Sequence, residues 1–351
     1  MIKIENIIKE YNTKDKSKIR VLNNINLTIK DGEMIALLGA NGSGKSTLLK
    51  CICGVLGLTS GSIRVDGKDA FKNRKYLIKN MGVIFNQKPS FIIDLSVRDN
   101  LNFFQAIYEI PQEKFDANID FIDQYLKFKD LLEKPYRKLS FGERVKCEIV
   151  SILLHDPQYI YMDEPTIGLD PTTKRILWDL IRELNDSGHT IILCSHDMHE
   201  VDMLCDNVGI INTGNLVAYD TPQGLKDSLL ESNRQEMTEA LSKISDENDV
   251  SNSTQEDIDN LSLRKMSILL KNQDDEIIES IKNSDDVKSM EIAHNGRINL
   301  RIDSFDDMAV QNVLDGISFS GGIIKSVSTE EPSLEDVFIK STSEVNEDDR
   351  A

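Results

Sequence analysis

The sequence of 351 residues contains no long hydrophobic run. A helix that spans a membrane needs about 18 or more consecutive apolar residues, and no such stretch occurs. The first residues, MIKIENIIKEY, alternate like a strand and lack the charged and then apolar layout of a signal peptide. These absences predict a chain that is made in the cytoplasm and stays there, with no membrane span of its own.

Cysteines are also few, and no two of them form a CxxC pair. The five are Cys51, Cys53, Cys147, Cys194 and Cys205. Their odd number and apolar surroundings favour reduced core residues over a disulfide framework. The CxC pair could in principle bind a metal, but nothing nearby completes a set of ligands.

A surplus of basic residues is missing from both parts of the chain. Residues 1–224 hold 30 acidic and 28 basic residues, whereas from Leu225 onward there are 29 acidic and 13 basic ones. The net charge of −18 therefore comes mostly from the C-terminal part. This balance excludes a nonspecific nucleic-acid binder, which needs a basic surface. The length suggests two domains.

Over the first 225 residues, short apolar runs rich in Ile, Val and Leu alternate with helical patterns. The expected strands are Ile2–Ile8, Val21–Ile29, Met34–Leu38, Ser62–Val65, Gly82–Phe85, Tyr159–Met162, Thr190–Cys194 and Val208–Ile211. The expected helices are about Lys45–Cys53, Val97–Tyr108, Lys114–Tyr125, Glu143–Leu154, Thr172–Asn185 and Met198–Cys205. This alternation predicts an α/β domain over 1–225 with a largely parallel sheet. The block from about 87 to 154 holds helices without a clear strand and predicts a helical insert.

The character of the sequence changes after Leu225. Residues 226–264 are mostly polar and acidic, and they predict a linker or a mobile helix. From 265 to 340 the pattern is strand, helix, two strands, helix and strand, with His294-Asn295-Gly296 as the hairpin signal between the middle strands. This order predicts a small α+β domain of the ferredoxin-like type. Residues 341–351 form a charged tail.

One glycine-rich segment carries the clearest chemical signal. GANGSGKST, residues 39–47, fits the pattern G-x-x-x-x-G-K-[ST] and stands between a buried strand and a helix, as that pattern requires. Its glycines let backbone N–H groups surround a phosphate at the positive end of the helix. Lys45 can then reach the β- and γ-phosphates, and the Ser46 hydroxyl can hold Mg²⁺. The residues expected to bind the nucleotide are Gly39, Ala40, Asn41, Gly42, Ser43, Gly44, Lys45, Ser46 and Thr47.

A second segment supplies two carboxylates. YIYMDEP, residues 159–165, is an apolar strand that ends in Asp163 and Glu164. A strand that delivers Asp163 beside the phosphate loop gives Mg²⁺ its second protein contact. Glu164 is then placed to polarise a water for attack on the γ-phosphate. Many strands end in acidic turns, so this segment is informative only together with the phosphate loop.

Three single residues are weaker candidates. Gln87 ends the strand GVIFN, where it could touch Mg²⁺ and the attacking water. His196 follows the apolar strand TIILCS and would emerge at the same sheet edge, although a lone histidine is more often structural. A helical metal pair of His196 and His199 lacks a further ligand. Tyr11 is the nearest upstream aromatic residue that could stack on a base.

Over about residues 1–225 the sequence resembles the ATP-binding subunit of an ABC transporter. The resemblance rests on six motifs in the family's order, which are GANGSGKST, Gln87, LSFGE, YIYMDEP, GLDP and His196. The resemblance implies a RecA-like P-loop NTPase core of the ABC type, with ATP and Mg²⁺ as cofactors. It implies that Glu164, His196 and Gln87 carry out hydrolysis. It implies that Ser46, Gln87 and Asp163 bind Mg²⁺, and that Tyr11 binds ATP together with the phosphate loop.

In such ATPases two copies pair head to tail, and each ATP lies between one copy's phosphate loop and the other copy's signature motif. The resemblance implies that Ser140, Phe141, Gly142 and Glu143 face the partner's ATP. It also implies that Asp170 crosses the interface as the D-loop carboxylate.

The signature also raises the question of why a helix start carries Gly142, since glycine weakens a helix by about 0.8–1 kcal/mol relative to alanine. The resemblance implies that its N–H is left open to the partner's γ-phosphate; sequence drift is the alternative. The commonest signature in the family is LSGGQ, so Phe141 and Glu143 are departures. The extra carboxylate of Glu143 could weaken the sandwich, although it also suits a capping box with Ser140.

The ending PSLEDVFI and the small appended domain resemble the exporter branch that includes drug, sodium, viologen-type and peptide efflux ATPases. The implied function is an ATP-binding and hydrolysing subunit that drives a separately encoded integral membrane permease. It would pair with a second copy or a homologous ATPase, and lie on the inner face of the cell membrane through the permease. The permease would dock near Gln87–Asn102, where Phe91, Ile92 and Ile93 either contact it or pack the insert's own core.

Three other functions fit parts of the pattern. A translation-factor ATPase carries two such units in one chain and meets RNA, whereas this chain has one unit and an acidic C-terminal part. A DNA-repair ATPase places a long coiled coil between the phosphate loop and the signature, and the gap of roughly 90 residues has no room for it. The third is a regulatory or immunity module that uses ATP as a switch, against which loss of hydrolysis in Glu164→Gln and co-purification of a permease would argue.

Overall fold

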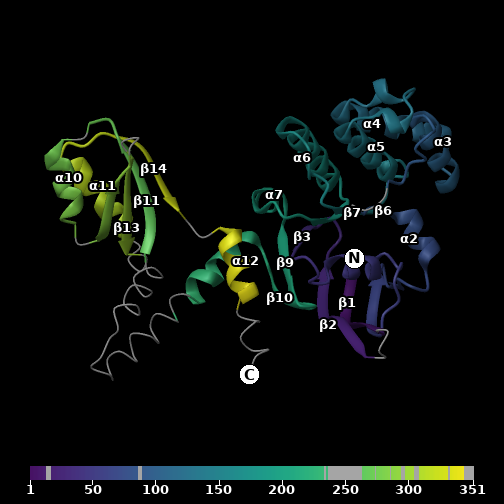
Figure 1. Ribbon diagram of the computed structural model, residues 1–351, viewed down its shortest axis with the longest axis horizontal. Coiled ribbons are helices and arrows are strands. Elements are labelled where there is room, and N and C mark those ends of the chain that lie inside the picture. Colours follow the sequence, from purple (N-terminus) through teal and green to yellow (C-terminus); the bar gives the residue numbers. More distant parts are fainter. Residues whose placement is uncertain are drawn as a thin grey trace. The chain divides into compact units, whose positions relative to one another are not determined.

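The computed structural model describes residues 1–12, 17–85, 89–232, 235, 263–272, 274–284, 286–293, 297–303, 308–330 and 333–343. The chain divides into two compact units. The first unit is Met1–Gln223 with Phe338–Ala351, and the second is Gly224–Val337. Each has a hydrophobic core of its own, and Figure 1 shows both, coloured along the chain.

The first unit begins with an antiparallel sheet in the order β2-β1-β4-β5. Its strands are β1 (Ile2–Asn12), β2 (Lys18–Ile29), β4 (Ser60–Val65) and β5 (Lys68–Asp69). At the start of β1, Ile2 and Ile4 are buried whereas Lys3 between them is exposed. The buried face packs in one core with Ile35 and Leu48, which precede and follow the phosphate loop. The loop is therefore fixed to packed structure on both sides.

A second sheet forms the main α/β layer, in the order β10-β9-β3-β8-β7-β6. Its strands are β3 (Met34–Leu38), β6 (Met81–Ile84), β7 (Tyr159–Asp163), β8 (Thr190–Cys194), β9 (Asn207–Asn212) and β10 (Asn215–Asp220). All neighbouring strands run parallel except β10 and β9, so the predicted, largely parallel sheet is confirmed. Because β3, β8 and β7 are adjacent and parallel, the loops after them meet at one sheet edge.

Helices accompany the parallel strands. They are α1 (Lys45–Ile52), α2 (Arg74–Asn80), α6 (Pro171–Asp186) and α7 (Met198–Leu204). α6 shows why the sequence folds as it does here: its apolar residues Leu177, Leu180 and Leu184 are buried on one side. The spacing of three and four residues between them is that of one face of a helix.

A helical insert lies between β6 and β7 in the chain and is visible beside them in Figure 1. It contains α3 (Val97–Tyr108), α4 (Gln112–Leu126), α5 (Phe141–Leu153) and the short 3₁₀ turns Lys129–Leu131 and Tyr136–Lys138. Among its described residues the only β pairing is the isolated bridge between Ser96 and Pro135, so the predicted insert is confirmed. α5 starts two residues before the predicted Glu143, because Ser140 already caps it.

The apolar cluster predicted near the start of the insert divides in two. Phe91 is 4% exposed and stacks on Tyr136 with ring centroids 4.8 Å apart, so it belongs to the insert's own core. Ile92 and Ile93 are 46% and 53% exposed. Of the three predicted residues, only Ile92 and Ile93 are therefore exposed enough to contact another protein.

The second unit has the predicted order of elements. They are β11 (Leu263–Leu270), α10 (Asp275–Lys282), β12 (Val287–Ile292), β13 (Arg297–Asp303), α11 (Ala309–Phe319) and β14 (Ile324–Glu330). The sheet order is β12-β13-β11-β14, with every neighbouring pair antiparallel, which confirms the ferredoxin-like prediction. Met266 and Ile298 from the sheet pack with Ile277 of α10 and Ile317 of α11 in a separate core. The predicted hairpin turn, 294–296, lies outside the described residues.

The last helix, α12 (Leu334–Ser343), crosses the division between the units. Within the first unit, Asn212 Nδ2 at the end of β9 donates to the Thr342 carbonyl over 3.1 Å. In the described part of the chain, no helix is long and apolar enough to cross a membrane.

Candidate functional site

The three motifs predicted from the sequence line one cavity at the carboxyl ends of β3, β7 and β8. Its volume is about 590 Å³. The residues that line it are Val21, Asn41, Gly42, Ser43, Gly44, Lys45, Ser46, Thr47, Asp163, Glu164, Ile167 and His196. The phosphate loop, both carboxylates and the histidine are thus brought together by adjacent parallel strands. Val21 and Ile167 were not predicted, because single apolar residues carry no motif.

Two glycines of the phosphate loop are fixed by the surrounding fold. A Cβ on Gly39 would lie 2.4 Å from the Ile211 carbonyl oxygen and equally close to Ser43 Oγ. Gly44 has φ +113° and caps the start of α1, where a Cβ would lie 2.8 Å from the Val21 carbonyl oxygen. Side chains are excluded at both positions, because the loop packs directly against the backbone of β9 at Gly39 and of β2 at Gly44.

The lysine of the loop is buried and held by the loop itself. Lys45 Nζ donates to the carbonyls of Gly39 at 2.5 Å and Ala40 at 3.1 Å, and the residue is only 9% exposed. Burial lowers the pKa of Lys45, and the nearby acidic groups Cys194, Glu164 and Asp163 oppose that shift. A buried ammonium at the N-terminus of a helix is a site for an anion such as a phosphate.

A further polar atom of the loop is suited to bind a phosphate. Ser43 is 5% exposed, and its Oγ is buried with no hydrogen-bond partner among the described residues. Buried polar atoms in folded proteins are nearly always paired, so an unpaired one calls for a missing partner. A phosphate oxygen would supply it.

The two carboxylates and the histidine form the opposite wall. Glu164 has φ +55°, a conformation that is uncommon outside glycine and often marks functional sites. Its N–H donates to the Cys194 carbonyl at 2.8 Å, and its Oε1 lies 3.1 Å from His196 Nε2. Burial raises the pKa of both Asp163 and Glu164; for Glu164 the charge of His196 opposes the rise and that of Asp163 adds to it.

The predicted Mg²⁺ ligands can be compared with this geometry. Ser46 and Asp163 line the same cavity, and their hydroxyl and carboxylate oxygens are donors that Mg²⁺ prefers. Gln87 lies outside the described residues. The described residues hold no cluster of three or more His, Cys, Asp or Glu fit for a metal, so His196 and His199 gain no further ligand among them. Mg²⁺ commonly takes only one or two protein oxygens and completes its shell with phosphates and water.

Tyr11 is placed away from the cavity wall. It lies near the end of β1, is 40% exposed, and pairs with Ile19 of β2, two residues before the cavity residue Val21. Lys9 Nζ lies 5.0 Å from the centroid of the Tyr11 ring. Tyr11 is therefore not among the residues that line the cavity.

The signature residues lie at the N-terminus of α5 and are partly engaged by their own chain. Glu143 N donates to Ser140 Oγ at 3.4 Å, and Ser140 N donates to Glu143 Oε2 at 2.8 Å, which completes a capping box. Lys134 Nζ lies 3.1 Å from Glu143 Oε1. The backbone N–H of Ser140 and then Lys134 lower the pKa of Glu143. The carboxylate that seemed a repulsive addition is thus already satisfied within the chain.

Gly142 and Phe141 are open to the surroundings. A Cβ on Gly142 would meet only Leu169 Cδ2, at 3.8 Å, which is an ordinary contact. Nothing in the described fold therefore requires glycine at this position. Phe141 is 56% exposed, and its ring packs against Gly168, where a Cβ would lie 3.0 Å away.

Asp170 has a role in its own chain that sequence reasoning missed. Its Oδ1 accepts from the N–H groups of Thr172 and Thr173, both at 3.0 Å, and so caps α6. Pro171 occupies the first helical position. An aspartate followed by proline is a recognised helix start, so the sequence did carry this signal.

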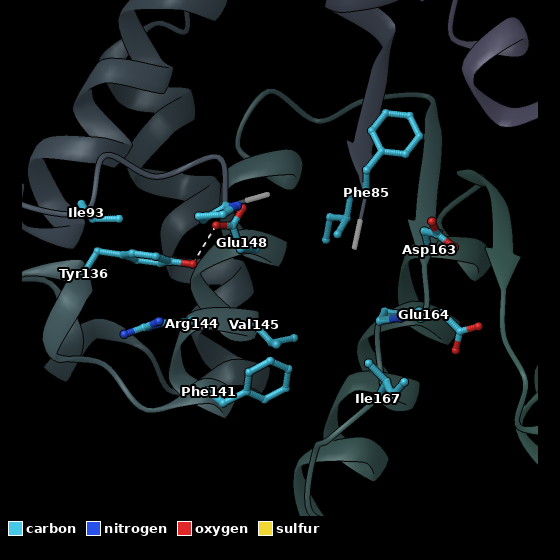
Figure 2. A pocket seen from close by; sticks show the side chains of 13 residues that line it. Phe85, Ile93, Tyr136, Phe141, Arg144, Val145, Glu148, Asp163, Glu164 and Ile167 are labelled. Atoms are coloured by element: carbon cyan, nitrogen blue, oxygen red, sulfur yellow. Dashed lines mark hydrogen bonds between the residues drawn. The ribbon is translucent and has the colours of Figure 1, made fainter. Parts of the chain in front are cut away.

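A second cavity of about 280 Å³ adjoins the first, since Asp163, Glu164 and Ile167 line both. Figure 2 shows Phe141 and Val145 of α5 on one side of it and Ile167 on the other. Tyr136 donates to Glu148 Oε1 at 2.8 Å in its wall. This largely apolar space separates the signature helix from the end of β7.

Two family models match the chain. One, described as ABC transporter, covers residues 22–167; the other, described as ATP-binding protein DrrA1-3-like, C-terminal domain, covers residues 256–342. The chain is 34% identical over 223 residues to the ABC transporter ATP-binding protein NatA of Bacillus subtilis (strain 168), covering 63% of this chain and 89% of that protein. It is 31% identical over 225 residues to the linearmycin resistance ATP-binding protein LnrL of the same strain, covering 64% and 70%.

Solved structures agree with this assignment. The structure of cbiO1 from Clostridium perfringens, part of the ABC transporter complex cbiONQ, has a TM-score of 0.56 at 31% identity, covering 67% of this chain and 93% of that one. The dimeric structure of MJ0796, a bacterial ABC transporter cassette, has a TM-score of 0.57 at 25% identity, covering 63% and 98%. The predicted ABC-type P-loop fold is confirmed. The chain belongs to the ABC transporter ATP-binding proteins and is the ATP-hydrolysing subunit of such a transporter.

Proposed function

We propose that two copies of this chain close head to tail around two Mg-ATP and thereby drive a separate exporter permease. The observation that carries the proposal is the free space around Gly142. It stands at an exposed helix start where a side chain would fit, yet the residue is glycine. A backbone N–H that must meet a phosphate of another copy explains this choice, whereas the chain's own fold does not.

Within one copy, the phosphate loop binds ATP through its backbone N–H groups and Lys45. Ser46 and Asp163 hold Mg²⁺, together with Gln87, and the bound ion supplies charge neutralisation at the β- and γ-phosphates. Glu164 acts as the general base toward the attacking water. His196, 3.1 Å from that carboxylate, orients it and contacts the γ-phosphate. Tyr11 stacks on the adenine.

Across the interface, the partner's γ-phosphate meets the N-terminus of α5. Ser140 and Gly142 contribute a hydroxyl and an N–H there, at the positive end of a helix of 13 residues. Glu143 stays bound to Lys134 and so does not repel the phosphate. Phe141 and Asp170 contribute surface to the interface beside these groups.

The proposed direction of transport is export. It is supported by the names of two relatives, a linearmycin resistance protein and the probable multidrug ABC transporter ATP-binding protein YbhF of Escherichia coli, 32% identical over 61% of this chain and 37% of that protein. The permease docks on the exposed Ile92 and Ile93, and holds the chain at the inner face of the cell membrane. We propose the approximate domain division 1–225, linker 226–264, accessory domain 265–340 and tail 341–351, with the acidic accessory domain as a regulatory or solvated cap. Its bounds shift by a few residues at the elements that span them, because residues 222–232 are helical, β11 begins at Leu263 and α12 ends at Ser343.

The test uses Glu164→Gln, which should bind ATP without hydrolysing it. Its mass in solution is measured with and without Mg-ATP, and the tagged full-length chain is purified from membranes to identify co-purifying proteins. An ATP-dependent monomer-to-dimer shift and a co-purified permease are expected. A chain that dimerises but never accompanies a permease would favour the alternative, an ATP-dependent regulatory or immunity module.

A further inference from the structure

Glu200 is a buried carboxylate that the proposed reaction does not use. It lies on α7 and is 0% exposed. Among the described residues only Lys45 and Glu200 are charged and buried, and Lys45 has a phosphate to bind. No Lys, Arg or His in the described part of the chain forms an ion pair with Glu200. A buried charge without a counter-ion must be stabilised by hydrogen bonds.

Three donors from three segments supply those hydrogen bonds. Thr166 Oγ1 and Ser195 Oγ donate to Glu200 Oε2 at 3.0 and 2.6 Å. Trp178 Nε1 donates to Oε1 at 2.8 Å. Thr166 and Ser195 are themselves 3% and 2% exposed, so neither hydroxyl has water as an alternative partner.

Two of these donors adjoin the residues proposed for hydrolysis. Thr166 stands two residues after Glu164, and Ser195 stands directly before His196. Ser195 Oγ also accepts from the Asp197 N–H at 3.1 Å, so the turn that carries His196 is held on both sides. One carboxylate therefore joins the loop after β7 to the loop after β8, behind the 3.1 Å contact of Glu164 with His196.

We infer that Glu200 is a positioning residue, which sets the distance between Glu164 and His196 by binding the loops that carry them. The inference rests on the proposed roles of those two residues. A rigid pair matters because a displacement of about 1 Å at a reacting group can lower the rate by roughly 100-fold. The phosphate loop makes no hydrogen bond to this network, so ATP binding should be independent of it.

The test compares Glu200→Ala and Glu200→Gln in the full-length chain, with Mg-ATP turnover as the readout. In Glu200→Ala we expect kcat to fall by about 10- to 100-fold while KM for ATP changes by less than about threefold. Glutamine keeps one oxygen for the Trp178 N–H, and its amide can donate to hydroxyls that turn to accept. Glu200→Gln should therefore restore kcat to within about fivefold of wild type.

A control separates positioning from general loss of stability. Tyr159 begins β7, the strand that ends at Asp163, and its hydroxyl donates to Asp66 at 2.5 Å at the far end from the cavity. Tyr159→Phe should lower the melting temperature and leave kcat unchanged. If it lowers kcat as much as Glu200→Ala does, destabilisation alone accounts for both and the inference is overturned.

A double-mutant cycle with His196→Ala gives the sharper readout. If Glu200 acts by positioning His196 and Glu164, Glu200→Ala should lower kcat by a much smaller factor in a His196→Ala background than in the wild-type chain. A purely structural residue would lower kcat by the same factor in both backgrounds, so that the two losses multiply. Multiplicative losses would overturn the inference.

The single tryptophan reports on the network directly. Trp178 is the only tryptophan in the chain and donates to Glu200, so its emission should shift in Glu200→Ala and not in Tyr159→Phe. If Glu200→Ala does not fold, Ser195→Ala and Thr166→Val each remove one link, and both should lower kcat with KM unchanged. Unchanged kcat in both would refute the inference.

The outcomes also separate this inference from the proposed function. Wild-type turnover in Glu164→Gln and His196→Ala would reject the proposed roles themselves. Lost turnover in those variants with wild-type turnover in folded Glu200→Ala would reject the positioning role alone.

Discussion

The chain contains two glycine-bearing helix starts that the proposed function places on opposite sides of an ATP, and they are built differently. At α1 the loop is complete within one copy: Lys45 is 9% exposed, and a side chain at Gly39 would collide with backbone 2.4 Å away. At α5 the helix start is open: Phe141 is 56% exposed, and a Cβ at Gly142 would find its nearest contact at 3.8 Å. The chain's own fold requires glycine at the first site. At the second site it does not, and the proposed function assigns the requirement to a phosphate bound by the other copy.

The largest effect on ATP turnover should come from a substitution in the phosphate loop. Lys45→Ala removes the only buried cation of the described residues, and the phosphates lose its charge at a position that is only 9% exposed. We expect Mg-ATP turnover to fall by roughly 1000-fold. Turnover and nucleotide binding by calorimetry measure this, and a variant with normal turnover would place the nucleotide elsewhere.

The next effect should appear only when two copies meet. An aspartate at Gly142 fits the space and suits the first turn of a helix, so the monomer should keep its stability and its affinity for ATP. Facing a triphosphate, however, the like charge should weaken closure by about 100-fold or more. The measurement is the ATP-dependent mass shift of Gly142→Asp in a Glu164→Gln background.

The neutral variant Gly142→Asn has nearly the same size and serves as the control for Gly142→Asp. It should close more readily than the aspartate variant, since only the charge differs. Equal and undiminished closure in both would support sequence drift at Gly142 after all.

A matched pair of alanine substitutions compares the phosphate loop with the start of α5 without any ligand. Gly39→Ala forces a Cβ against the Ile211 carbonyl, and such overpacking should cost about 1–3 kcal/mol. Gly142→Ala meets no obstacle and replaces a poor helix former, so it should stabilise the chain by about 0.5 kcal/mol. Thermal unfolding of the two variants should move in opposite directions; a loss at Gly142 would mean that the fold does need the glycine.

The same contrast explains how much of this molecule could be predicted. β3 and β8 have the predicted bounds because continuous apolar runs mark strands buried on both faces. β10 and α2 were missed, since NLVAYD is only half-buried and α2 buries Leu77 alone, which leaves no clear period. Glu200 was missed because its three donors come from distant segments of the chain.

The function of the signature residues at the start of α5 could be predicted only by resemblance, for a physical reason. A phosphate loop shows its ligand through local constraints: glycines, a lysine and a strand-to-helix junction. The proposed ligand of a signature helix belongs to another copy, so the isolated sequence shows only that Gly142 is unexplained. The cap formed by Ser140 and Glu143 was readable, whereas the Lys134 contact with Glu143 was not, because no motif connects them.

A similarly small effect should come from Glu143→Gln, which tests whether that carboxylate belongs to its own helix or to the interface. The bonds to Ser140 and Lys134 hold the pKa of Glu143 below its ordinary value of 4.5. It therefore stabilises the fold above that value, and the contribution is lost as pH falls through the lower folded pKa. At pH 7 the variant should unfold about 0.5–1 kcal/mol more easily, with ATP-driven closure nearly unchanged. Melting curves from pH 7 to 3 should converge with wild type at the acidic end; a variant that instead closed much more tightly would show that Glu143 faces the phosphate.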